Sequence, residues 1–173
     1  FKDDKLLIQA LTHKSFDTKN NYEKLEFLGD RVLGFVISKK LLELYPNEKV
    51  GMIDKKLANL VNKNKCFEIG KELELERYIL TGNTDKKKKV NIEKKIISDC
   101  CESLIGAIYI DKGFEVSSKF ILNYWKNYLN LSDITVIDSK TRLQEYSLKK
   151  FKALPIYKLI SNTGPRHKPN FKI

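Results

Sequence analysis

Apolar residues recur at helical spacing along most of the first 130 residues, and no segment of this region alternates as a half-buried strand would. The pattern predicts a short helix at 5–12, a long helix at 22–44 and another at 51–70. A loop at 82–95 leads into the start of a further helix, and a last one spans 114–129. The sequence therefore predicts an all-α domain, which at this length can bury an adequate core.

Carboxylates interrupt two of these apolar helices at a spacing that places them on one face. Glu23, Glu26 and Asp30 fall within about 60° of one another on a helical projection. Asp99 and Glu102 are likewise about 60° apart. The opposite faces are apolar, with Leu25, Leu28, Val32 and Phe35 on the first helix and Ile97, Leu104, Ile105 and Ile108 on the second. Either helix alone is typical of a solvated acidic face, but the pair favours a buried metal site, because clustered carboxylates need a neutralising cation.

Glycine lies on the acidic side of both helices, as Gly34 and Gly106. A glycine costs a helix interior about 1 kcal/mol relative to alanine, so its presence there needs a reason. We expect these two glycines to let the acidic helices cross closely. An all-oxygen donor set between such helices suits Mg²⁺, with Mn²⁺ as a substitute, and disfavours zinc and copper.

Charge indicates the kind of partner. The 173 residues include 33 Lys and Arg against 22 Asp and Glu, which gives a net charge of +11. This excess predicts affinity for a polyanion, with nucleic acid as the first candidate and an anionic membrane surface as the second. No apolar run approaches the roughly 20 residues of a membrane span. The three cysteines, Cys66, Cys100 and Cys101, are odd in number, which favours a reducing compartment and buried thiols.

Three motifs resemble one known family. Asn21–Leu33, with the sequence NYEKLEFLGDRVL, resembles the signature of the ribonuclease III family. Ser98–Asp111, with the sequence SDCCESLIGAIYID, resembles the second catalytic helix of those enzymes. Ala10–Ser15, with the sequence ALTHKS, resembles the segment that precedes the signature. Three motifs in the right order with compatible separations are far more specific than one.

The resemblance implies an all-α endonuclease domain over residues 1–130 and a divalent-metal-dependent hydrolysis of double-stranded RNA. The products would carry 5′-phosphate and 3′-hydroxyl ends, and the substrates would include ribosomal and other RNA precursors in the cytoplasm. The resemblance implies Glu26, Asp99 and Glu102 as the principal metal ligands. Asp30 would complete the acidic quartet, and Glu23 would be a supporting carboxylate at its rim.

The family also implies a homodimer with duplex RNA as its partner, and neither DNA nor a membrane. Phe27 matches a position that packs across the dimer interface, although a core phenylalanine is an equally simple interpretation. One departure concerns Val50, which stands before Gly51 where many bacterial members carry a glutamate. We expect this difference to remove an auxiliary metal or RNA contact and to slow turnover, without abolishing activity.

Composition shifts at 131–138, which we interpret as a linker into a strongly basic segment at 139–173. Lys140–Tyr146 resembles the first helix of a double-stranded-RNA-binding domain of α-β-β-β-α order, and Pro155–Ile160 resembles its first strand. Gly164–His167 resembles the loop that follows. The positions expected to contact the minor grooves of RNA are Thr141, Gln144, Glu145 and His167. The resemblance stops within a second strand at Phe171–Ile173, so we expect a truncated domain that is poorly ordered or whose strands pair imperfectly.

Two other classes of protein share parts of this pattern. A non-catalytic relative could bind duplex RNA with the same fold and charge, but loss of the acidic quartet would mark such a protein, and the quartet is present. A helical-bundle protein with a carboxylate-bound iron centre would need Glu-x-x-His pairs, and neither His13 nor His167 follows a glutamate at that spacing.

Overall fold

A computed structural model of the chain describes residues 1–2, 4–82, 93–131, 139–158, 161–163 and 170–172. The chain divides into two compact units, Phe1–Ile134 and Thr135–Ile173. The linker expected at 131–138 lies almost wholly outside the described residues. The assignment of domains to 1–130 and 139–173 therefore stays a prediction.

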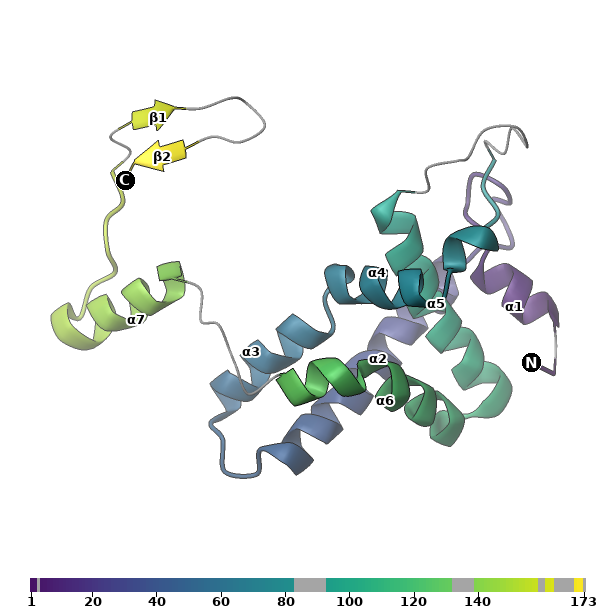
Figure 1. Ribbon diagram of the computed structural model, residues 1–173, viewed down its shortest axis with the longest axis horizontal. Coiled ribbons are helices and arrows are strands. Elements are labelled where there is room, and N and C mark those ends of the chain that lie inside the picture. The colour runs from purple at the N-terminus through teal and green to yellow at the C-terminus, as the bar shows by residue number, and fades with distance from the viewer. Residues whose placement is uncertain (3, 83–92, 132–138, 159–160, 164–169, 173) are drawn as a thin grey trace. The chain divides into compact units, whose positions relative to one another are not determined.

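The first unit is built from helices, as Figure 1 shows. They are α1 (Asp4–Ala10), α2 (Glu23–Leu44), α3 (Val50–Leu60), α4 (Lys63–Glu72), the short 3₁₀ helix η1 (Leu75–Arg77), α5 (Lys94–Lys112) and α6 (Phe114–Leu131). The predicted all-α class is confirmed. The helices expected at 22–44 and 114–129 are α2 and α6, and the short helix expected at 5–12 is α1, which ends two residues earlier.

Helix α5 is the centre of this unit. It packs against α1, α2, α4 and α6, and all of its side chains from Ile97 to Ile108 are buried. The largest fully buried side chains around it include Trp125 of α6 and Leu33 and Ile37 of α2. Because α5 carries Asp99 and Glu102 in this stretch, the fold places two carboxylates inside the core.

The two acidic helices cross at Gly29 and Gly106. A Cβ atom built on Gly29 would overlap the carbonyl oxygen of Glu102 and would lie 2.8 Å from the amide nitrogen of Gly106. A Cβ on Gly106 would overlap the carbonyl oxygen of Leu25. The expectation of a close crossing through Gly106 is therefore correct. The choice of Gly34 was wrong, since nothing lies within 4 Å of a Cβ at that position.

The single helix expected at 51–70 is also wrong, because the chain breaks it at Asn62. The Asn62 backbone is extended, with φ −74° and ψ 161°, and its side-chain oxygen accepts a hydrogen bond from the Lys65 amide. The side-chain amide donates to the carbonyl oxygens of Asn59 at 2.9 Å and Ala58 at 3.3 Å. One asparagine thus ends α3 and begins α4, and residue 63 becomes the first residue of a new helix.

The apolar face expected on α2 is only partly buried. Leu25 and Val32 are buried, whereas Phe35 is 61% exposed and packs edge-to-face on Phe114 with ring centroids 5.6 Å apart. All three cysteines are free and buried, as expected. Among the described residues, no helix has the length and apolar character that a bilayer crossing requires.

The second unit contains helix α7 (Ser139–Phe151) and strands β1 (Ser161–Thr163) and β2 (Asn170–Lys172). The strands pair antiparallel, with Asn162 opposite Phe171. The first strand was expected at Pro155–Ile160, but the described part of that range, 155–158, forms no strand. The expected loop Gly164–His167 lies outside the described residues. A second strand around Phe171 agrees with the structure.

Candidate metal centre

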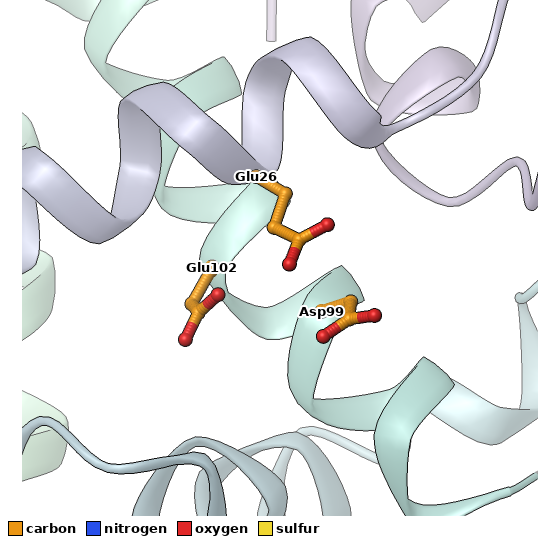
Figure 2. A group of neighbouring side chains, drawn as sticks. All are labelled: Glu26, Asp99 and Glu102. Atoms are coloured by element: carbon orange, nitrogen blue, oxygen red, sulfur yellow. The ribbon is translucent and has the colours of Figure 1, made fainter.

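Three acidic side chains from two helices converge on one point. Figure 2 shows Glu26 reaching from α2 toward Asp99 and Glu102 of α5. One carboxylate oxygen from each residue lies within 4.8 Å of the others. Asp99 and Glu102 are buried, while Glu26 is half-buried and opens the cluster to solvent. Three of the four ligands expected from the sequence are thus brought together.

The local sequence explains this convergence. Asp99 and Glu102 are one turn apart on α5 and therefore share a face. Glu26 precedes Gly29 by one turn on α2, and Glu102 precedes Gly106 by one turn on α5. Because the helices touch at these two glycines, the carboxylates one turn before each of them meet.

A lysine from a third helix lies in the middle of the cluster. The Lys63 ammonium nitrogen is 2.9 Å from Glu26 Oε1, 2.6 Å from Asp99 Oδ1 and 2.7 Å from Glu102 Oε2. Lys63 is the first residue of α4. The position where the three carboxylates converge therefore favours a cation, and here an ammonium group takes it.

Asp99 has two further polar neighbours. The Lys95 ammonium lies 2.8 Å from Asp99 Oδ2, and the Tyr22 hydroxyl donates a hydrogen bond of 3.3 Å to the same oxygen. The Tyr22 ring packs against the ring of His13, with centroids 5.6 Å apart. In the structure His13 thus supports a residue that contacts Asp99, and its Nδ1 is 2.7 Å from the Ser15 hydroxyl.

Burial and these contacts together shift the pKa values of Asp99 and Glu102 in opposite directions. Burial acts to raise the pKa of Asp99, but hydrogen bonds from Lys63 and Lys95 hold that pKa below its usual value. Burial raises the pKa of Glu102, and the hydrogen bond from Lys63 offsets this only in part. The negative charge of Asp30 adds to the rise in the pKa of Glu102.

The groups around the carboxylates stay in their ordinary protonation states near neutral pH. Burial acts to lower the pKa of Lys63, but its hydrogen bonds to Asp99, Glu102 and Glu26 raise it above the usual value. A hydrogen bond with Cys101 and burial raise the pKa of the Cys66 thiol, which lies beside Glu102. Lys63 is therefore a charged ammonium, and Cys66 is a neutral thiol.

The other two acids expected at the site lie outside the group of three. Asp30 forms an ion pair with Arg31 and is partly exposed. Glu23 is exposed, and its Oε1 lies 3.1 Å from the Lys14 ammonium. Both belong to the face of α2 that carries Glu26, so they lie at the margin of the cluster in this structure.

The remaining predicted residues are distributed over several elements. Phe27 on α2 is 65% exposed, with the Arg31 guanidinium over its ring at 5.1 Å. Val50 is the first residue of α3 and is 80% exposed. Thr141, Gln144 and Glu145 lie on α7, where Gln144 is half-buried. His167 lies outside the described residues.

Three residues that contact the acidic cluster were not predicted from the sequence: Lys63, Lys95 and Tyr22. Lys95 precedes Asp99 by one turn, so its proximity to this carboxylate was available from helical spacing. Tyr22 lies within the signature segment next to Glu23. Lys63 carries no such signal, because only the packing of α4 against α5 brings it to the carboxylates.

The donor set fits a hard divalent cation. The three ligands supply only carboxylate oxygens, which Mg²⁺ and Mn²⁺ prefer, and none of the three is a histidine or a cysteine. The ammonium of Lys63 marks the point at which a positive charge is stabilised. The arrangement can therefore hold a metal ion between α2 and α5.

Comparison with known proteins identifies the family. The sequence profile of the family described as Ribonuclease-III-like matches residues 3–129. Ribonuclease 3 of Pelagibacter ubique is 66% identical over 173 residues, covering 100% of this chain and 78% of the relative. Ribonuclease 3 of Rhizobium johnstonii is 42% identical over 175 residues, covering 100% of this chain and 73% of the relative.

Solved structures agree with the sequence matches. A structure of the nuclease domain of ribonuclease III from Campylobacter jejuni superposes with a TM-score of 0.70 and 37% identity. The superposition covers 75% of this chain and 91% of the Campylobacter chain. These matches show that the chain belongs to the ribonuclease III family of endoribonucleases.

Proposed function

We propose that this protein hydrolyses phosphodiester bonds within double-stranded RNA, leaving 5′-phosphate and 3′-hydroxyl ends, and that it does so with a divalent metal ion. The observation that carries this proposal is the meeting of Glu26, Asp99 and Glu102 in a member of the ribonuclease III family. Mg²⁺ is the proposed ion, with Mn²⁺ as a substitute, because every ligand is a carboxylate.

Glu26, Asp99 and Glu102 would hold the ion. When bound, a divalent ion supplies an activated water and stabilises charge on the oxygens of the scissile phosphate. Asp30 is the proposed fourth carboxylate, because its charge already acts on Glu102 and its ion pair with Arg31 is partly exposed. Glu23 would support the rim of the site.

The protein's own residues orient these ligands. Tyr22 and Lys95 both contact Asp99 Oδ2, which leaves Asp99 Oδ1 directed toward the centre of the cluster. The Cys66 thiol lies near the carboxylate of Glu102 and acts to lower the pKa of that group. A fixed orientation of the ligands reduces the reorganisation that metal binding and catalysis require.

We also propose that the protein acts as a homodimer with Phe27 in the interface. The Phe27 side chain is 65% exposed on α2, so its ring is accessible to a second copy of the chain. The Campylobacter relative was described with a flexible region involved in dimer formation of its nuclease domain. A dimer would present two acidic clusters to one RNA duplex, one for each strand.

The basic C-terminal unit is the proposed second RNA contact. Thr141, Gln144, Glu145 and His167 are the positions expected to touch RNA, and α7 carries the first three of them. Weak binding with a strong salt dependence is expected, since lysines supply most of the charge. Ribosomal and other RNA precursors in the cytoplasm are the proposed substrates.

A cleavage assay tests this proposal against the alternative of a non-catalytic RNA-binding relative. The protein is incubated with a uniformly labelled RNA duplex of about 30 base pairs, which is long enough for both nuclease and RNA-binding contacts. One reaction contains Mg²⁺ and another contains EDTA. A DNA duplex of the same length replaces the RNA in a control reaction. The variants are Glu102→Gln and the matched surface control Glu115→Gln on α6. We expect the protein to cut the RNA duplex and not the DNA duplex. Cutting should be lost with EDTA and in Glu102→Gln, and it should be kept in Glu115→Gln. Binding without cutting by the unaltered chain would favour the non-catalytic alternative.

A further inference from the structure

Lys63 occupies the place that a metal ion would need. Its ammonium nitrogen lies 2.6–2.9 Å from one oxygen of each of the three carboxylates. Ligand oxygens surround Mg²⁺ at about 2.0–2.1 Å. A divalent ion and an ammonium group cannot share this point, because two cations a few ångströms apart in a partly buried site repel strongly.

The two lysines of the site differ in their relation to this point. Lys95 contacts Asp99 through Oδ2, the oxygen that also accepts from Tyr22. Lys63 contacts the oxygens that face the centre, and it is the only one of the two that reaches all three carboxylates. Entry of an ion therefore requires Lys63 to leave, whereas Lys95 can stay.

The structure allows Lys63 to leave without moving the helix that carries it. The side chain is 51% exposed, so one side of it borders solvent. Its backbone is held by the Asn62 cap at the start of α4, and four flexible methylene groups separate this backbone from the ammonium. Rotation about side-chain bonds is enough to withdraw the charge.

The cluster also needs Lys63 when no metal ion is bound. Asp99 and Glu102 are buried, and three carboxylates within 4.8 Å of one another destabilise the fold unless a cation compensates them. The ammonium supplies this compensation from within the chain. A lysine at this point therefore stabilises the metal-free protein and competes with the ion.

We propose that Lys63 is the resident counter-cation of the metal-free site and that it exchanges place with the divalent ion. This inference rests on the proposed metal site and adds a residue that sets its affinity. Lys63 lowers the affinity of the site for metal and keeps the empty site folded. The opposite role, in which Lys63 supports the loaded site, requires that its removal weaken metal binding.

The test measures Mn²⁺ binding by electron paramagnetic resonance and unfolding midpoints in EDTA, without any activity assay. The variants are Lys63→Met, which keeps an unbranched side chain one atom shorter and removes the charge, and Lys63→Arg, which keeps the charge. Lys71→Met is the matched control, because Lys71 lies on the same helix and pairs with Glu76 away from the cluster. Glu102→Gln reports on the metal site itself.

We expect Lys63→Met to bind Mn²⁺ about tenfold more tightly than the unaltered chain, a change of about 1.4 kcal/mol. Its unfolding midpoint should fall in EDTA and recover with Mn²⁺, while Lys71→Met leaves the affinity unchanged. Lys63→Arg should stay close to the unaltered chain in both measurements. If Lys63→Met folds only with Mn²⁺ present, the same conclusion follows, because the missing charge is then replaced by the ion.

Unchanged or weaker Mn²⁺ binding by Lys63→Met, with binding lost in Glu102→Gln, would overturn the exchange and leave the metal site intact. Binding that survives Glu102→Gln would overturn the metal site, and the exchange with it. The two failures are therefore distinguishable in one set of measurements.

Discussion

The indole nitrogen of Trp125 donates a hydrogen bond of 2.8 Å to the carbonyl oxygen of Leu60. Trp125 lies on α6 and is fully buried, and Leu60 is the last residue of α3. Carbonyl groups in the last turn of a helix lack partners within that helix, so a buried one needs a donor from elsewhere. This bond fixes the end of α3 two residues before the break at Asn62.

Trp125→Phe should destabilise the protein by more than the loss of apolar area alone. The substitution leaves the Leu60 carbonyl buried without its donor, which costs about 1–3 kcal/mol. Urea denaturation followed by circular dichroism measures the change in the free energy of unfolding. Tyr124→Phe on the same helix is the control. Equal losses in the two variants would contradict a structural role for the indole hydrogen bond.

Asn62→Ala should lower stability and disturb the start of α4. The substitution removes the hydrogen bond to the Lys65 amide and those to the carbonyl oxygens of Asn59 and Ala58. Loss of an N-cap costs about 0.5–2 kcal/mol. Urea denaturation would measure this change in the free energy of unfolding. Asn59→Ala, at an exposed position inside α3, should have little effect or raise stability slightly. A loss in Asn59→Ala as large as that in Asn62→Ala would argue against the cap.

Gly29→Ala and Gly34→Ala are a matched pair of substitutions on α2. We expect the first to lower the free energy of unfolding and the second to raise it. The new Cβ at position 29 would overlap backbone atoms of α5, and separation of the helices should cost at least about 1–3 kcal/mol, as overpacking does. Position 34 is open, so alanine there should raise the free energy of unfolding by up to about 1 kcal/mol. Thermal unfolding of both variants measures this, and a stable Gly29→Ala would rule out the close crossing.

Phe27→Asp should convert the proposed dimer into a monomer. A carboxylate placed in an apolar contact loses hydration without gaining a partner, which is strongly unfavourable. Leu42→Asp is the matched control, because Leu42 is another exposed apolar residue of α2. Sedimentation velocity at several protein concentrations distinguishes the two states. Dissociation by both variants, or by neither, would remove Phe27 from the interface.

The spacing of apolar and acidic residues correctly predicted the features that a single helix determines. The spacing of Asp99 and Glu102, and the apolar residues opposite them, define one face of α5 without knowledge of any other element. The same spacing marked Glu26. It favoured Gly34 as the crossing point, and this was wrong, because the face of α2 that meets α5 carries Gly29.

Features that depend on the packing of several helices were not predicted. Lys63 reaches the carboxylates only because Asn62 interrupts the helix that periodicity predicted to run on to residue 70. Asparagine is a common N-cap residue, but the single helix at 51–70 was predicted from its apolar residues alone. Phe35 was expected in the core because it shares a face with Val32, yet it is exposed.

The contact between Gly29 and Gly106 is made by main-chain atoms. The positions of the carboxylates in the acidic cluster therefore do not depend on which side chains fill the core. Most core side chains can be exchanged for others of similar volume, with small shifts of the helices that carry them. No such side chain lies between α2 and α5 at their crossing. Substitutions of core side chains away from this crossing, such as Leu41 near the end of α2, should therefore reduce the fraction of folded protein while each folded molecule cleaves at an unchanged rate.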